Sequence, residues 1–139
     1  MYADELTVMT LLKRIRNSKR ILKYAIPAAS AAALRVELTA HREKLDWMEA
    51  ELSRICTVRG WELPAGTLPI PNLNIHRLRK GNLTDSAISQ LIIRDYQGAI
   101  IQGLRLLHRL PYPDLPIETA VKTACDRLFG CIFRLQDYL

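Results

Sequence analysis

Apolar residues recur at alternating steps of four and three along two long stretches of the chain. The first stripe has one polar member, a histidine, and consists of Leu34, Leu38, His41, Leu45, Met48, Leu52 and Ile55. The second lies near the C-terminus and consists of Ile117, Val121, Ala124, Leu128, Cys131, Leu135 and Tyr138. This spacing places each stripe on one face of a slightly underwound helix, which must bury that face against other helices. The pattern therefore predicts an all-α bundle.

Turn and cap signals divide the chain into four predicted helices. Pro27 suits the first turn of the second helix, because its missing N–H would have no partner there. Gly60 is expected in the left-handed conformation that ends this helix, with Trp61 folding back on Ile55 and Cys56. The four helices are expected to cover residues 3–25, 28–59, 83–109 and 115–138.

Local signals also mark the other three helices. Asn82, followed three residues later by Asp85, indicates the start of the third helix, and Asp114 is the expected cap of the fourth. The first helix should turn an apolar face inward, made of Val8, Leu11, Leu12, Ile15 and Leu22.

Residues 60–82 are expected to form an ordered crossover with extended, proline-rich turns. A third helix of about 27 residues spans ~40 Å. An extended segment of about 22 residues can cover that length, but the short turn before Asp114 cannot. Branched apolar side chains are expected to dock the crossover on the bundle, namely Leu68, Ile70, Leu73, Ile75 and Leu78.

The chain is therefore expected to form a single domain, residues 1–139, in which two antiparallel helix hairpins are joined by one long crossover. This is the arrangement of a four-helix ferritin-like bundle. A plain up-down-up-down bundle with a long middle loop is the alternative, although loops of that length are uncommon.

Three glycines lie inside predicted helices, where each costs ~1 kcal/mol relative to alanine. They are Gly98, Gly103 and Gly130. Close backbone approach between the third and fourth helices is the favoured explanation, and a ligand cavity is the alternative.

The net charge of +6 is concentrated in two segments, the first helix and the crossover. The first helix carries a predicted basic surface of Lys13, Arg14, Arg16, Lys19, Arg20 and Lys23. Such a surface could grip phosphates or an anionic surface. Because no aromatic platform is interleaved with these residues, a solvated helix face is the favoured interpretation and nucleic acid the less favoured partner.

The sequence does not favour export or membrane insertion. Basic residues followed by the apolar stretch 25–34 resemble a signal peptide, but this stretch is mostly alanine, contains Pro27 and leads directly into the first stripe, so no signal peptide is expected. No apolar run approaches the ~20 residues of a transmembrane helix. Three cysteines without a Cys-x-x-Cys pair favour a reducing compartment.

A ferritin-like bundle raises the question of a di-iron site. Such a site needs a glutamate from each of two helices and a Glu-x-x-His motif on each of the other two. The second helix offers Glu37 and His41 at a longer spacing, the third offers Asp85 and Asp95, and the fourth has no histidine. Because most ligands are missing, we expect no metal, no cofactor and no catalytic residue.

His41 is the best single candidate for a functional side chain, because it is polar within a buried stripe. We expect it to belong to a buried polar cluster of Glu37, His41, Asp95 and Tyr96, in which it is a hydrogen-bonded core histidine. The pair Arg35 and His41 also resembles the Arg-x(4–6)-His pattern of HEPN ribonucleases, which is the enzymatic alternative.

Short motifs along most of the chain point to one family. They are Ala33-Leu34-Arg35, Leu38, His41, Met48, Arg59-Gly60-Trp61, Asp85-Ser86-Ala87-Ile88 and Tyr96-Gln97-Gly98. Together they resemble the spore coat protein F family of the ferritin-like superfamily. The resemblance implies a ferritin-like bundle found in or around the coats of bacterial endospores, with no established catalytic residues.

The expected function is therefore that of a non-enzymatic structural or interaction protein of the spore-coat type. Its expected partners are other proteins, among them coat proteins or a second copy in a homodimer, and its expected location is the cytoplasm or the spore coat. The alternatives are a degenerate di-metal oxidase, a HEPN-like ribonuclease using Arg35 and His41, and a nucleic-acid or anionic-surface binder that uses the basic first helix.

Overall fold

All regular structure in the described part of the chain is helical. The computed structural model describes residues 2–66, 73–112 and 114–139. Its elements are α1 (Tyr2–Ala28), α2 (Ala32–Val58), α3 (Leu73–Arg79), α4 (Asp85–Arg109), α5 (Leu115–Leu135) and the short 3-10 helix η1 (Gln136–Tyr138). The all-α prediction is therefore confirmed, with one short helix, α3, that the sequence pattern did not predict.

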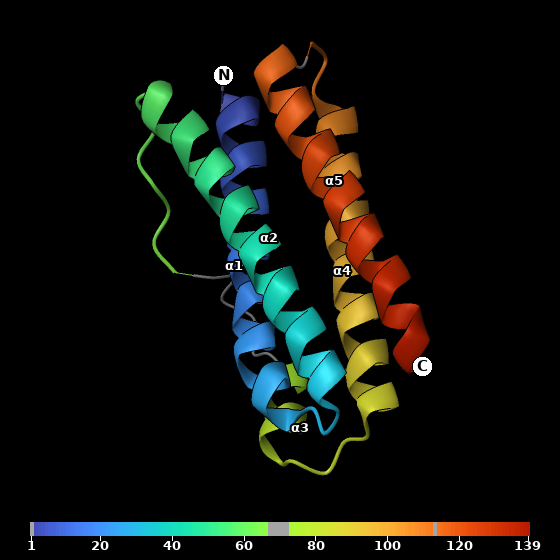
Figure 1. The fold of residues 1–139 in the computed structure, drawn as a ribbon. Helices are drawn as coiled ribbons and strands as arrows, with labels where there is room; N and C mark the ends of the chain where they lie inside the picture. Colours follow the sequence, from blue (N-terminus) through green and yellow to red (C-terminus); the bar gives the residue numbers. More distant parts are fainter. Residues whose placement is uncertain (1, 67–72, 113) are drawn as a thin grey trace.

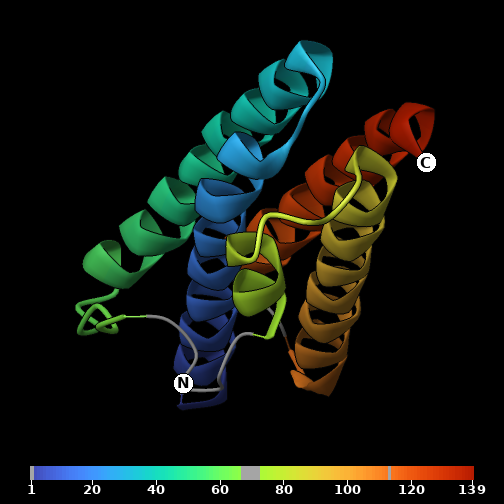
Figure 2. The ribbon, with the colours of Figure 1, turned by 90° about the horizontal axis from the view of Figure 1, so that it is seen from below.

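The long helices form two antiparallel pairs (Figure 1). Helix α1 packs along α2 and α4 packs along α5, while α1 also contacts α4 and α2 contacts α5. In Figure 1, α2 ends at the top of the bundle and α4 begins at the bottom, so these two helices run in the same direction. Helix α3 lies at the lower end beside α1, as the view from below shows (Figure 2).

The predicted apolar stripes form the core between these helices. Every member of the α2 stripe is buried, and so is every α5 member up to Leu135, while Tyr138 is partly buried. The predicted inward face of α1 is buried as well, because Val8, Leu11, Leu12, Ile15 and Leu22 each have 1% exposure or less. The helical periodicity therefore identified the core correctly.

The connection between α1 and α2 differs from the prediction. Pro27 lies inside the last turn of α1 instead of opening α2. A proline so close to a helix end removes one hydrogen bond from a helix that is about to stop, so its cost is small there. The Arg35 side chain donates to the carbonyl oxygens of Ala29 and Ser30, at 2.8 Å each, and so satisfies acceptors in the connection.

Asp85 has a different role from the one its spacing suggested. Its carboxylate accepts hydrogen bonds from the N–H groups of Ser30 (2.7 Å) and Ala31 (2.9 Å), just before α2. The side chain that caps α4 is that of Thr84, which accepts from the N–H of Ala87 at 3.1 Å. The predicted cap Asn82 is therefore wrong, and Asp85 instead joins the start of α4 to the start of α2.

Two other predicted helix ends are confirmed. Gly60 has a φ of +69°, and the N–H of Trp61 donates to the Cys56 carbonyl at 2.9 Å while that of Gly60 donates to the Thr57 carbonyl at 3.2 Å. This is the Schellman pattern that ends a helix. Asp114 caps α5, because its side chain accepts from the N–H of Ile117 at 3.1 Å.

The crossover is more helical than predicted. Residues 73–79 form α3, whose side chains Ile75 and Leu78 are buried, whereas Leu73 is 74% exposed. The prediction that Leu73 docks is therefore wrong: residues three apart share a face of a helix, and residues two apart do not. Leu68 and Ile70 lie outside the described residues. Earlier in the crossover, Arg16 donates to the carbonyl oxygens of Pro64 and Gly66 and so ties residues 64–66 to α1.

The helical glycines have three different surroundings. A Cβ at Gly103 would meet Cys125 Sγ of α5 at 3.5 Å and Leu11 Cδ1 of α1 at 3.6 Å, which are ordinary van der Waals distances, so close approach to α5 does not require a glycine here. A Cβ at Gly98 would lie 2.8 Å from Arg14 Nη2, which belongs to α1. A Cβ at Gly130 would have no neighbour within 4 Å.

Candidate functional site

Three of the four residues in the predicted buried polar cluster meet inside the bundle. His41 of α2 and Tyr96 of α4 have exposures of 0% and 1%. His41 Nδ1 lies 3.1 Å from the Tyr96 hydroxyl, and its Nε2 lies 2.9 Å from Glu37 Oε2. The Nε2 and Oε2 atoms are close but are not aligned for a hydrogen bond. Glu37 is also 3.8 Å from Arg134 at the surface.

Burial keeps His41 and Tyr96, the two fully buried residues of this cluster, uncharged at neutral pH. Burial lowers the pKa of His41 to about 4, although the neighbouring Glu37 carboxylate opposes the shift. Burial also raises the pKa of Tyr96 well above its ordinary value. At neutral pH the phenol therefore keeps its proton and the imidazole is uncharged, so the two groups share one hydrogen bond whose direction depends on the imidazole tautomer. Both side chains are enclosed by the core, so the arrangement orders α2 against α4 without offering an accessible acid or base.

Asp95, the fourth predicted member, lies in a separate group. Ser18 Oγ donates to Asp95 Oδ2 at 2.6 Å, and Arg14 Nη2 lies 3.1 Å from Oδ1 and 2.8 Å from the backbone carbonyl oxygen. Burial raises the pKa of the Asp95 carboxyl, and the Arg14 charge and the Ser18 hydrogen bond oppose that shift. Asp95 therefore ties α4 to α1, on a different side of α4 from Tyr96.

The remaining candidates for metal or nucleophilic chemistry are also dispersed. Within residues 2–66, 73–112 and 114–139, no three His, Cys, Asp or Glu side chains form a group that could hold a metal ion. Cys56, Cys125 and Cys131 are free, buried thiols, and burial raises the pKa of Cys125 to about 11. The guanidinium of Arg35 bonds to carbonyls of the α1–α2 connection while His41 faces the core, so these two side chains have separate partners.

Half of the predicted basic surface is engaged in ion pairs. Arg14 pairs with Asp95, Arg16 Nε lies 2.7 Å from Glu49, and Lys19 Nζ lies 2.6 Å from Asp46 and 2.7 Å from Glu49. Although burial opposes it, the hydrogen bonds from Lys19 and Arg16 hold the pKa of Glu49 below its ordinary value. In the described part of the chain, Lys13, Arg20 and Lys23 have no carboxylate partner.

Helix α3 adds positive charge beside the C-terminal part of α1. Its residue Arg79 lies near Tyr24 of α1, whose ring centre is 5.9 Å from both Lys23 Nζ and Arg79 Cζ. We call this the α1–α3 basic surface, and it consists of Arg20, Lys23, Arg77, Arg79 and Lys80. The sequence showed the positive charge of the crossover but not its position, because that depends on α3 packing against α1.

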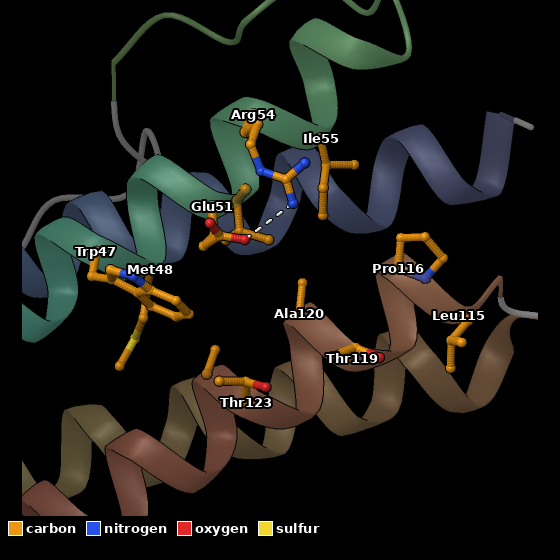
Figure 3. A pocket seen from close by; sticks show the side chains of 12 residues that line it. Trp47, Met48, Glu51, Arg54, Ile55, Leu115, Pro116, Thr119, Ala120 and Thr123 are labelled. Carbon is orange, nitrogen blue, oxygen red and sulfur yellow. Dashed lines mark hydrogen bonds and ion pairs between the residues drawn. The ribbon is translucent and has the colours of Figure 1, made fainter.

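A groove between α2 and α5 was not predicted from the sequence (Figure 3). It has a volume of about 310 Å³. One wall is α2, where Trp47 is 43% exposed and Glu51 pairs with Arg54 at 3.2 Å. The lining residues are Trp47, Met48, Glu51, Leu52, Arg54, Ile55, Leu115, Pro116, Thr119, Ala120, Thr123 and Ala124.

The small side chains of α5 explain why the two helices leave a groove. A threonine–alanine pair occurs twice there, one helical turn apart, as Thr119-Ala120 and Thr123-Ala124. These small residues lie opposite larger residues of α2. At the edge, Arg127 Cζ stacks 4.0 Å from the centre of the Trp47 ring, which holds the indole beside the opening. The repeated small pair was the sequence signal for this groove, but it also suits ordinary close helix packing.

Comparisons with known proteins bear on the fold. No family model matches the chain, and no curated protein matches it. The structure is similar to the crystal structure of a conserved hypothetical protein from Mycobacterium tuberculosis, with a TM-score of 0.75 and 12% sequence identity over 99% of this chain and 98% of that one. At this identity the likeness shows a shared fold alone. No helix of the described residues is long and apolar enough to span a bilayer.

Proposed function

We propose that this chain is a non-enzymatic interaction protein built on a metal-free ferritin-like bundle. The observation that carries the proposal is the contrast between the two kinds of site. The central side chains His41, Tyr96, Ser18 and Asp95 are buried, and they form hydrogen bonds in two pairs, His41–Tyr96 and Ser18–Asp95. The groove between α2 and α5, in contrast, is apolar and open to solvent.

The ferritin-like part of the proposal is supported by the directions of the helices. Two antiparallel hairpins in which the second and third long helices run parallel require a long connection between the hairpins. In Figure 1, α2 and α4 run parallel, with the end of α2 at one end of the bundle and the start of α4 at the other.

The proposed partner in the groove is an amphipathic helix of another protein. A channel between two antiparallel helices matches the elongated apolar face of such a helix, which inserts side chains at one-turn intervals. The exposed Trp47 edge supplies the kind of anchor that dominates protein interfaces, and the Glu51–Arg54 pair and the hydroxyls of Thr119 and Thr123 give polar groups around the apolar lining.

The spore coat is the proposed setting, together with the cytoplasm in which coat proteins are made. Its support is the family resemblance of the motifs, for example Arg59-Gly60-Trp61, whose glycine and tryptophan form the helix end that their pattern indicates. In this setting the groove partner would be another coat protein.

The test of the interaction proposal is site-specific photo-cross-linking in the source cells. A photoreactive phenylalanine derivative replaces Leu115, which is 73% exposed at the groove, and Val36, which is 71% exposed on α2, serves as the matched control. We expect a discrete heavier species from position 115 and none from position 36. Equal labelling at both positions, or none at 115, would contradict a partner in the groove.

The enzymatic alternatives are tested on the same purified protein. Metal analysis should give far less than one equivalent of iron, manganese or zinc. About one bound equivalent, lost in Glu37→Ala or His41→Ala, would instead support a di-metal oxidase. RNA cleavage that Arg35→Ala and His41→Ala abolish without unfolding the chain would support the HEPN-like ribonuclease.

A second candidate function is binding to a polyanionic surface. The observation that favours it is the α1–α3 basic surface, whose five exposed cations have no carboxylate partner in the described part of the chain. Binding of a short DNA duplex should weaken as salt rises, and Arg79→Glu should weaken it more than the control Arg105→Glu on α4. Equal effects of the two substitutions would mean that net charge alone, and no particular surface, drives the binding.

A further inference from the structure

The outward face of α5 carries two exposed aromatic side chains that the groove does not use. Phe129 is 62% exposed and Phe133 is 73% exposed. Because they are four residues apart, they lie on one side of the helix, a turn from each other. The groove takes its α5 residues from positions 115–124, so this second face is a separate surface.

Gly130 lies on this face and has no internal explanation. Glycine weakens a helix relative to alanine, so a helical glycine usually permits a close contact. A Cβ at Gly130 would have no neighbour within 4 Å, and the residue is exposed. The space it leaves is therefore outside the bundle, where it allows the backbone of another helix to come close.

The charges around Gly130 identify a partner. Asp126 lies four residues before the glycine and Arg134 four residues after it, so all three share one face of α5. If a second α5 crosses the first in the antiparallel direction at Gly130, a residue n positions before the glycine lies opposite the residue n positions after it on the other helix. Asp126 of each copy then faces Arg134 of the other, and the contact is formed twice.

We propose that a second copy of this chain docks on this face, and that the two copies form a symmetric dimer with their α5 helices crossed antiparallel at Gly130. A two-fold interface must be complementary to itself, and equal spacing of opposite charges about the crossing point provides this. Asp126 has no ion-pair partner in the described part of the chain, and Arg134 is 62% exposed with a single contact to Glu37 at 3.8 Å. Both charges are therefore available to a second copy.

The phenylalanines supply the apolar part of the interface. In an antiparallel two-fold pair, the same flank of each helix lies on the same side of the crossing, so Phe129 and Phe133 of both copies meet there. Buried aromatic side chains contribute ~150–250 Å² each, so four such rings fall short of a standard interface of about 1,600 Å². We therefore expect a reversible dimer whose population depends on concentration.

Sedimentation equilibrium on the full chain measures this association between roughly 1 and 300 µM, the range that covers micromolar affinities. Wild type should shift from monomer to dimer across this range. Asp126→Arg places like charges opposite each other twice and should weaken the dimer roughly tenfold or more. The double variant Asp126→Arg with Arg134→Asp restores opposite charges across the same axis and should recover dimerisation.

Phe133→Ser tests the apolar contact, with Val36→Ser as a control of similar exposure on α2. The first should favour monomer and the second should not. Unfolding midpoints equal to wild type establish that each variant is folded. A wild-type chain that is monomeric throughout, or a dimer that Asp126→Arg and Phe133→Ser leave intact, would overturn the proposal. Failure of the charge-reversed double variant to recover would overturn the antiparallel crossing. Because Leu115 lies outside this face, the groove proposal is tested independently.

Discussion

Hydrogen bonding distinguishes His41 from the other residues of its stripe. Leu38 and Leu45, one turn to either side, contribute to the core by burial alone, whereas His41 also holds the Tyr96 hydroxyl at 3.1 Å. A buried donor or acceptor that loses its partner keeps its desolvation cost. The stability of this site is therefore a property of the pair, and replacing one member affects the other.

The substitution His41→Leu tests this coupling. Its shape suits the stripe, but it leaves the buried Tyr96 hydroxyl without a partner, so we expect a loss of about 1–3 kcal/mol in the free energy of unfolding. The double variant with Tyr96→Phe should recover most of this loss. Urea unfolding followed by circular dichroism measures both values. If His41→Leu alone is as stable as wild type, the hydrogen bond has no net value.

The pH dependence of stability is the second prediction for His41. Its pKa is about 4 in the folded chain, below the ordinary value of 6.5. Between these values the unfolded chain binds a proton that the folded chain does not, so stability falls as the pH is lowered through this window and the loss is complete below the folded pKa. We expect His41 to account for roughly 2–4 kcal/mol of that loss. The difference between wild type and His41→Leu/Tyr96→Phe, measured from pH 7 to pH 4, isolates this contribution from that of Glu49.

At the scale of the elements, the two ends of α2 differ in how far along the sequence their hydrogen-bond partners lie. The end of α2 is satisfied within six residues, from Cys56 to Trp61. The start of α2, in contrast, receives its hydrogen-bond acceptor from Asp85, 54 residues away from Ala31. A helix end of the second kind forms only when the two hairpins are in place.

At the start of α4, the sequence predicted Asn82 as the cap, whereas the structure shows Thr84. We expect Thr84→Ala to lower the free energy of unfolding by about 0.5–2 kcal/mol, because the N–H of Ala87 loses its acceptor. Asn82→Ala should change it much less. Thermal and urea unfolding of the two variants give the comparison, and a larger effect at Asn82 would mean that the cap lies two residues earlier than the structure places it.

At the scale of the whole molecule, the crossover joins the two hairpins through a small number of docked residues. Ile75 and Leu78 are buried against the bundle, and Arg16 donates to the carbonyls of Pro64 and Gly66. These contacts hold the connection against α1 near both of its ends.

Leu78→Ala tests how firmly α3 is docked. Removing a buried leucine side chain should destabilise the fold by about 2–5 kcal/mol and speed hydrogen exchange in α3. Leu73→Ala, at an exposed position of the same helix, serves as the control and should change neither quantity appreciably. Equal effects of the two substitutions would show that α3 does not depend on the burial of Leu78.

The amino-acid sequence by itself determined the helical class, the inward faces of α1, α2 and α5, and two of the helix ends. These features depend on residues within a few turns of one another, where the helical period and the preferences of Gly60 and Asp114 act directly. The sequence also brought Glu37, His41 and Tyr96 into one hypothesis, because each is a polar group on or beside a buried face.

Only the tertiary structure decided which partners the polar side chains take. Asp95 bonds to Arg14 and Ser18 instead of His41, and three cations of the predicted basic surface form ion pairs with carboxylates. The α2–α5 groove and the position of α3 beside Tyr24 arise in the same way. These pairings depend on the rotation and axial stagger of neighbouring helices. A local period fixes which face of a helix is buried, but it does not fix which residue of another helix that face meets.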